Sequence, residues 1–355
     1  MMLFPGGKRG RAGAAWPILI WVLAAGAALV ESQAVPGRGE IEETIEGLSR
    51  GRSLGEVAVS PDGKRVAWSE GMRGEEELHV APLENLGKAE RVTAARGPAG
   101  RCRDTELVWE PDSRAVAFFS DCADPGGQAD LYLSRLDGNA PRRLTTLRGF
   151  VDEPSFSPDG TRIGFLYVPG ATRPAGALAA MKPWSGVIGE EGLEIQRVAM
   201  VAISGAAPAA PVIATPENLH VYEFDWSPDG KNLAYIAADP PGENNWWVAK
   251  LYTQAIGERA VPILSPAEEK GPLHGLQIAV PRWSPDQKTI AFIGGLMSDQ
   301  GATGGDVWIV PSEGGMARDL TRGRATSPAL SPRPRRSNLR TANPSAARIR
   351  AASTR

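Results

Sequence analysis

Cysteine and histidine are scarce in this 355-residue chain, which has two cysteines and three histidines. The histidines, at positions 79, 220 and 274, are far apart, show no metal-ligand spacing and have no cysteine cluster beside them. The sequence therefore predicts no metal site and no other cofactor, and we do not expect His79, His220 or His274 to be catalytic.

Long apolar runs are missing from the chain after its N-terminus. The single run, Ala14–Val30, follows three basic residues and precedes small residues that end at Ala34. This pattern is typical of a secretory signal peptide cleaved after Ala34, with an uncleaved anchor helix as the alternative. We expect residues 1–34 to be removed and the mature protein to be exported, to a bacterial periplasm or beyond, without further contact with a membrane.

The body of the chain has no excess of positive over negative charge. The formal net charge is −2, but residues 1–34 carry +2 and residues 333–355 carry +7, which leaves −11 on residues 35–332. The C-terminal stretch has seven arginines, no acidic residue and no apolar period, which predicts a disordered tail. We interpret it as an out-of-frame or truncated end. The acidic body argues against a nucleic-acid partner.

What the chain does contain is one hairpin pattern, repeated five times. In Ser227-Pro228-Asp229-Gly230, proline presets φ at the first corner, aspartate can bond nearby N–H groups, and glycine accepts a positive φ. Alternating apolar residues on both sides predict two strands joined by a tight turn. We assign the aspartates of these turns to structure rather than catalysis. The predicted structural turn residues are Pro61, Asp62, Gly63, Pro111, Asp112, Pro158, Asp159, Gly160, Pro228, Asp229, Gly230, Pro285 and Asp286.

The spacing of the hairpins indicates an architecture. The turn prolines are 50, 47, 70 and 57 residues apart, and a third strand and often a short fourth one follow each hairpin. Four-stranded antiparallel repeats of this length predict an all-β fold, a β-propeller whose stacked blades bury one another's faces. Residues 53–332 hold about five blades and the start of a sixth at Pro332, an incomplete or open ring. We expect residues 35–52 to form a helical segment before the propeller.

The two cysteines flank the second hairpin, whose turn begins at Pro111. Pairing outward from this turn places Trp109 opposite Val116 and Thr105 opposite Ser120. Cys102 then arrives one position from Cys122, and a single bulge closes the gap. An exported chain matures where disulfides persist. We therefore predict a disulfide between Cys102 and Cys122, with two unrelated buried thiols as the alternative.

The Ser-Pro-Asp-Gly hairpins at Ser60, Ser157 and Ser227, with variants at Glu110 and Ser284, resemble the TolB-like (PD40, WD40-like) propeller repeat. The wider arrangement, about residues 40–332, is similar to the N-terminal propeller of the prolyl oligopeptidase (S9) family of serine peptidases, in its acylaminoacyl- and dipeptidyl-peptidase-like branch. The resemblance implies a propeller of seven or eight blades that caps an α/β-hydrolase domain in full-length relatives. The catalytic serine, aspartate and histidine belong to that domain, and we find no match to it in this chain.

Three further patterns suggest sites. The sequence Gly47-Leu48-Ser49-Arg50-Gly51 matches a nucleophile elbow, but it follows an acidic helix-like segment, so we interpret it as a helix end. Glu190-Glu191 lie in an insertion and resemble the paired glutamates that hold a substrate amine in dipeptidyl peptidases. A solvated acidic turn is the simpler interpretation of this pair. Trp246-Trp247 should lie in a strand, with one ring in the core.

We expect the chain to be a non-catalytic propeller that resembles the substrate-gating domain of an exported S9 peptidase. One alternative is a TolB-like periplasmic propeller that binds a protein partner. The other is a fragment of an active secreted aminoacyl or dipeptidyl peptidase. In each case the partner is a peptide or a protein.

Overall fold

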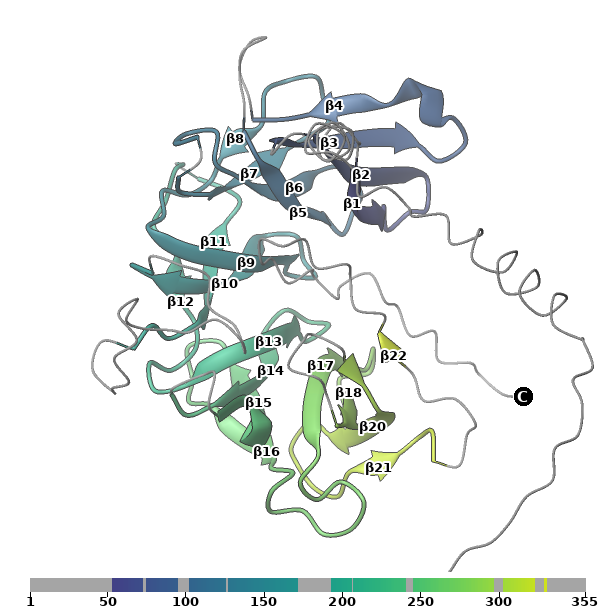
Figure 1. The fold of residues 1–355 in the computed structure, drawn as a ribbon, viewed down its shortest axis with the longest axis vertical. Coiled ribbons are helices and arrows are strands. Elements are labelled where there is room, and N and C mark those ends of the chain that lie inside the picture. Colours follow the sequence, from purple (N-terminus) through teal and green to yellow (C-terminus); the bar gives the residue numbers. More distant parts are fainter. Residues whose placement is uncertain are drawn as a thin grey trace, which may run out of the picture. The chain divides into compact units, whose positions relative to one another are not determined.

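The computed structural model describes residues 53–72, 75–94, 102–125, 127–171, 193–205, 207–240, 245–296, 303–322 and 329–330. These residues form five four-stranded antiparallel sheets, which we number blades 1 to 5 in chain order (Figure 1). Within the described ranges, none of the helices has the length and hydrophobicity needed to span a lipid bilayer.

Each blade takes its four strands in sequence order from one continuous segment of chain. Blade 1 has β1 (Ser53–Val59), β2 (Arg65–Met72), β3 (Glu75–Pro82) and β4 (Glu90–Val92). Blade 2 has β5 (Asp104–Trp109), β6 (Val116–Ser120), β7 (Asp130–Ser134) and β8 (Arg142–Arg143). Blade 3 has β9 (Gly149–Phe156), β10 (Arg162–Pro169), β11 (Arg197–Ala202) and β12 (Val212–Ile213).

The last two blades follow the same order. Blade 4 has β13 (His220–Trp226), β14 (Asn232–Ala238), β15 (Lys250–Ala255) and β16 (Val261–Leu264). Blade 5 has β17 (Gln277–Trp283), β18 (Thr289–Gly295), β20 (Asp306–Pro311) and β21 (Arg318–Asp319). A two-stranded sheet pairs β19 (Thr303–Gly304) with β22 (Ala329–Leu330), where the sequence predicts the start of a sixth hairpin. Two 3-10 turns, η1 (Leu86–Lys88) and η2 (Trp246–Val248), complete the elements.

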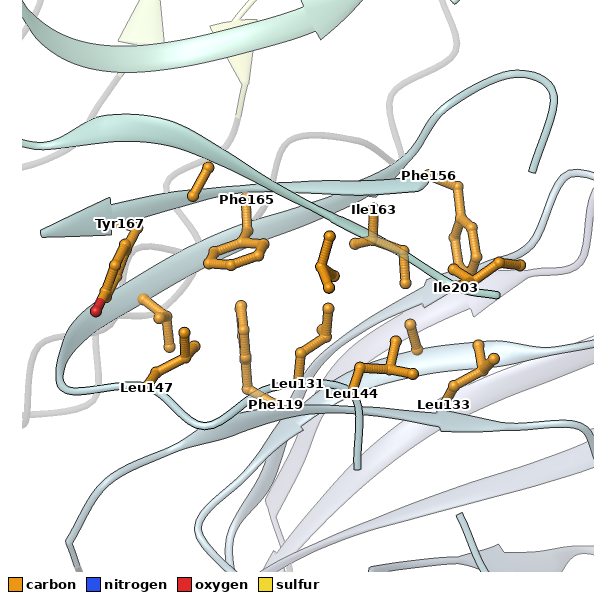
Figure 2. Close-up of a cluster of buried hydrophobic side chains, with 14 of the residues drawn as sticks. Phe119, Leu131, Leu133, Leu144, Leu147, Phe156, Ile163, Phe165, Tyr167 and Ile203 are labelled. Carbon is orange, nitrogen blue, oxygen red and sulfur yellow. The ribbon is translucent and has the colours of Figure 1, made fainter. Parts of the chain in front are cut away.

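The predicted all-β fold with four-stranded blades is confirmed. The interior lies between consecutive blades rather than inside any single one, as expected for a repeat whose units cannot bury both faces alone. Between blades 2 and 3, for example, Phe119, Leu131 and Leu144 face Ile163 and Phe165, all nearly inaccessible to solvent (Figure 2). Three further apolar clusters join blades 1 and 2, blades 3 and 4, and blades 4 and 5.

Two local predictions are wrong. Trp246 and Trp247 lie in the 3-10 turn η2 rather than in a strand, because β15 begins only at Lys250. In blade 2, Trp109 pairs with Val116 as predicted, but Thr105 pairs with Phe119 instead of Ser120. A bulge between Thr105 and Val108 shifts the register by one residue.

Candidate functional site: carboxylates along the first strands

The turn aspartates are committed to their own hairpins. The hydroxyl of Ser60 donates to Oδ1 of Asp62 at 2.7 Å, and the N–H of Lys64 donates to the same oxygen at 3.1 Å. The hydroxyl of Ser227 holds Asp229 in the same way at 2.6 Å. The serine hydroxyl, followed by the backbone N–H, lowers the pKa of both aspartates, so they stay ionised as acceptors.

The variant turns keep the geometry with other residues. Ser113 and Gln287 occupy the glycine position with φ of 65° and 61°, a region that residues other than glycine adopt less readily. Glu110 stands where the other turns have serine, and both of its carboxylate oxygens accept from Arg135 at 3.1 Å. All of the predicted turn residues therefore lie at hairpin corners. The hydrogen bonds described for these residues hold the turns and indicate no catalytic role.

The two cysteines are joined by a disulfide, with their Cα atoms 4.9 Å apart. The bulge between Thr105 and Val108 shifts the pairing of β5 and β6 by one residue, which brings Cys102 opposite Cys122. Asp104 lies beside the disulfide, and burial raises the pKa of its carboxyl to about 6. Because both sulfur atoms are bonded to each other, Asp104 is the one group of this cluster that could coordinate an ion, so the cluster does not form a metal centre.

The histidines do not converge. His220 is buried in blade 4, where desolvation lowers its pKa to about 4, so its ring is neutral at pH 7. His79 stacks on Trp68 in blade 1, with ring centroids 5.4 Å apart. His274 is exposed in the connection that precedes β17. Glu190, Glu191 and the Gly47–Gly51 motif lie outside the described residues.

A row of carboxylates that the sequence analysis missed links the first strands of blades 1 and 2, of blades 2 and 3, and of blades 4 and 5. The residue five positions before the turn proline is Glu56, Glu106, Glu153 and Glu223 in blades 1 to 4. Oε2 of Glu56 accepts the N–H of Leu107 in the next blade at 2.9 Å. Oε2 of Glu106 accepts the N–H of Glu153 at 2.8 Å, and Glu223 accepts the N–H of Val280.

Each of these amides lies at a bulge. In every blade the pairing of the first and second strands is interrupted near this position. Glu106, Glu153 and Val280 have φ of 56°, 51° and 57°, a conformation that is especially unfavourable for a β-branched residue such as valine. A bulge leaves a ladder amide unpaired, and a carboxylate is the strong acceptor that can satisfy it. The row thus fastens each strained strand to the preceding blade.

Blade 4 meets blade 5 through a second carboxylate as well. Oδ2 of Asp225 accepts the N–H of Trp283 at 2.8 Å. Burial raises the pKa of Glu223, and the Val280 amide and the Arg282 guanidinium oppose that shift. Burial also raises the pKa of Asp225, opposed by Arg282 and the backbone amides. One cation therefore faces two carboxylates at this junction.

The aromatic residues beside this junction form a cluster rather than two separate strand positions. The Trp246 ring lies 5.2 Å from the Trp247 ring and 6.3 Å from that of Tyr222, between centroids. Trp246 packs against Ala279, Val280 and Ile293 of blade 5, while Trp247 is 45% exposed. The prediction that one ring packs inward holds, although η2 rather than a strand positions it.

Comparisons with known proteins find relatives of part of this chain. The TolB homologue of Chlorobium luteolum is 31% identical over 124 residues, 35% of this chain and 26% of that protein. The uncharacterised peptidase YuxL of Bacillus subtilis is 33% identical over 113 residues, 31% of this chain and 17% of that protein. The chain thus spans about a quarter or less of these relatives' length. No known family profile matches it.

Solved structures show the same fold at low identity. A puromycin-hydrolysing peptidase of Mycobacterium tuberculosis superposes with a TM-score of 0.53 and 15% identity, covering 77% of this chain and 39% of that one. A prolyl endopeptidase superposes with a TM-score of 0.52 and 16% identity, covering 86% and 42%. The five blades and these likenesses define the class of this protein, a β-propeller. More particularly, its sequence is similar to that of TolB homologues and its fold is similar to part of these two peptidases, which supports the resemblance inferred from the hairpins.

Proposed function

We propose that this chain is an exported, non-catalytic propeller that receives a peptide or protein segment, as the substrate-gating domain of an S9 serine peptidase would. The observation that carries the proposal is the shared fold with peptidases, which covers 77% and 86% of this chain in the two structures compared. The hairpin aspartates support a scaffold role, because serine hydroxyls and backbone amides occupy them.

The net charge of the body of the chain supports a ligand class. Residues 35–332 carry a formal net charge of −11. A negative surface concentrates cations, so a free amino terminus or a basic side chain is the favoured part of a peptide ligand. In this proposal Glu190 and Glu191 contact the same amine. Residues 1–34 serve as the export signal, and the hydrolase domain belongs to full-length relatives.

Two alternative functions remain, one as a protein-binding propeller and one as part of an enzyme. The 31% identity to a TolB homologue favours a periplasmic propeller that binds a folded protein rather than a peptide. The similarity to YuxL, a peptidase by name, favours a part of an active enzyme.

The catalytic question is tested on the purified chain with aminoacyl and peptidyl chromogenic substrates. We expect no hydrolysis above the rate in buffer. Hydrolysis that disappears in Ser49→Ala would contradict the proposal, because the Gly47–Gly51 motif would then be a working nucleophile elbow.

Ligand preference is tested by fluorescence anisotropy with a lysine-rich peptide that has a free amino terminus and with an N-acetylated acidic peptide. We expect binding of the basic peptide only, weakened by salt. At a fixed salt concentration, the double variant Glu190→Gln/Glu191→Gln should bind the basic peptide more weakly than the unchanged protein. Glu313→Gln, which changes an exposed glutamate of blade 5, is the control and should bind with unchanged affinity. Binding of neither peptide would contradict the proposed recognition of a free amine or basic side chain and favour the TolB-like alternative.

A further inference from the structure

Blade 2 differs from the other blades at one position of its first strand. In blades 1 to 5, the residue seven positions before the turn proline is Leu54, Asp104, Val151, Val221 and Ile278. The last three belong to the apolar clusters between blades. Asp104 is 1% exposed, so a carboxyl group is buried where the repeat otherwise has an aliphatic side chain. Burial of a carboxylate costs free energy, so packing of the scaffold does not explain this acid.

One oxygen of the Asp104 carboxylate lacks a hydrogen bond. The hydroxyl of Thr93 donates to Oδ2 at 2.6 Å, and the hydroxyl of Ser120 is a further neighbour of the carboxylate. Oδ1 is buried and has no hydrogen-bond partner within the described part of the chain. Buried polar atoms without a partner are rare in folded proteins, and a bound ion is one of the groups that can satisfy them.

The disulfide places two sulfur atoms beside this carboxylate. Cys102 and Cys122 are the only cysteines of the chain, and their Cα atoms are 4.9 Å apart. The two sulfur atoms and a carboxylate oxygen of Asp104 all lie within 4.8 Å of one another. Asp104 pairs with Ser120 at the end of the ladder between β5 and β6, so two paired strands hold these three groups together.

Once the sulfur atoms are free, this set of groups suits a thiophilic divalent cation. Zn²⁺ binds thiolate sulfur at about 2.3 Å and carboxylate oxygen at about 2.0–2.2 Å, so tetrahedral ligand atoms are about 3.6–3.8 Å apart. Rotation of the two cysteine side chains reaches this separation after the S–S bond is broken, because their Cα atoms are close. Thiolates favour Zn²⁺ over Ca²⁺ and Mg²⁺, which prefer oxygen ligands.

We propose that reduction of the Cys102–Cys122 bridge creates a Zn²⁺ site in blade 2, with the two thiolates and Oδ1 of Asp104 as its protein ligands and water as the fourth. Bridge and metal exclude each other, because sulfur atoms bonded to each other are not thiolates. This site involves none of the residues proposed above to bind a peptide.

Opening the site requires an external dithiol. One thiolate of the dithiol attacks a sulfur atom of the bridge, which forms a mixed disulfide and releases the other cysteine as a thiol. The second thiol of the dithiol then displaces the second cysteine. The protein is left with two thiols and the dithiol becomes a disulfide. Zn²⁺ binding releases the two thiol protons to solvent.

The first test compares the full chain in its disulfide form with the chain reduced by a dithiol that is then removed under nitrogen. Competition with a chromogenic zinc chelator measures Zn²⁺ binding. We expect one Zn²⁺ per reduced chain and none for the disulfide form at the same concentrations. Co²⁺ in place of Zn²⁺ should give a thiolate charge-transfer band in the reduced chain. Equal binding by the two forms would overturn the proposal, since the sulfur atoms would then not be ligands.

The second test concerns the carboxylate. Asp104→Asn should raise the dissociation constant of the reduced chain for Zn²⁺ by about tenfold or more, because a neutral amide replaces a charged ligand. Asp124→Asn removes an exposed acid two residues beyond Cys122 and is the matched control, with unchanged affinity expected. Unchanged affinity in Asp104→Asn would overturn the assignment of Asp104 as a ligand.

Thermal unfolding distinguishes a folded site from binding to the thiols of an unfolded chain. Zn²⁺ should raise the melting temperature of the reduced chain, because a ligand of the folded state stabilises that state, and should leave that of the disulfide form unchanged. A reduced chain that is unfolded, or whose melting temperature does not rise with Zn²⁺, would also overturn the proposal.

Discussion

Blade 1 and blade 4 are built on the same hairpin but differ in what surrounds them. Phe224 and Trp226 in blade 4 are almost fully buried against blade 3, whereas Val57 and Val59 in blade 1 are more than half exposed. The strand pairing and the direction of these side chains agree between the two blades. The repeat position therefore sets the direction of a side chain, and the neighbouring blade sets its burial.

A second pair of equivalent positions in two blades reverses the usual rule that apolar side chains are buried and acidic ones exposed. Seven residues before the turn proline, blade 1 has Leu54, which is 71% exposed, and blade 2 has Asp104, which is 1% exposed. Thr93 donates its hydroxyl to Oδ2 of Asp104 at 2.6 Å, so the buried carboxylate has a strong donor. Leu54 is exposed because no blade precedes blade 1 in the described residues, and Asp104 is buried because blade 1 precedes blade 2.

The largest effect is expected from removing an aromatic side chain at a blade junction. Trp226→Ala should lower the free energy of unfolding by about 3–5 kcal/mol, because the site between blades 3 and 4 cannot collapse around the lost ring. The matched change in blade 1, Val59→Ala, should stay within about 0.5 kcal/mol in monomeric protein at low concentration. Urea denaturation followed by tryptophan fluorescence and circular dichroism measures both. Equal losses at the two positions would show that a blade covers Val59 in solution.

The next effect concerns the first hairpin of blade 2, which is closed by a disulfide. The corresponding hairpin of blade 4 is held by the hydrogen bonds between its strands. The double variant Cys102→Ser/Cys122→Ser should lose about 3 kcal/mol of stability, since a separation of 20 residues restricts the unfolded chain by roughly that amount. Urea denaturation of the variant, compared with the unchanged protein with and without reductant, gives the value. Two alkylatable thiols in exported protein digested without reductant, detected by mass spectrometry, would contradict the bridge.

The smallest effect is a difference in pH dependence between a buried and an exposed aspartate. Burial raises the pKa of Asp104 from an unfolded value near 3.8 to about 6. A raised carboxyl pKa stabilises the folded state below about pH 4, and this stabilisation is lost as the pH rises through 6. Asp104→Asn should therefore be more stable than the unchanged protein at pH 7, by no more than about 3 kcal/mol, and match it near pH 4.

Asp62 provides the opposite sign and serves as the control. Its pKa is lowered by the Ser60 hydroxyl and the Lys64 amide, so its contribution is present above about pH 4 and lost as the pH falls through the lowered value. Asp62→Asn should then be less stable than the unchanged protein at pH 7. Melting temperatures measured between pH 3 and pH 8 compare the variants. A parallel pH profile for Asp104→Asn and the unchanged protein would show that Asp104 does not titrate in this range.

Much of the fold follows from local pattern. The Ser-Pro-Asp-Gly turns combine proline, a hydrogen-bonding aspartate and a glycine at positive φ, so each predicts its hairpin without help from distant residues. The carboxylate row was missed because its partners belong to the next blade, 47 to 57 residues away. The available signal was a glutamate five residues before the turn proline in four of five repeats.

The sequence by itself determined the hairpins and their repetition, because these depend on backbone preference and on period-2 alternation. The tertiary structure decided the bulges, the reach of Glu56, Glu106 and Glu223 to the next blade, and the exposure of Val57 and Val59. A bulge shifts a register by one residue, and burial depends on which sheet lies opposite. Neither is written in the residues of a single strand.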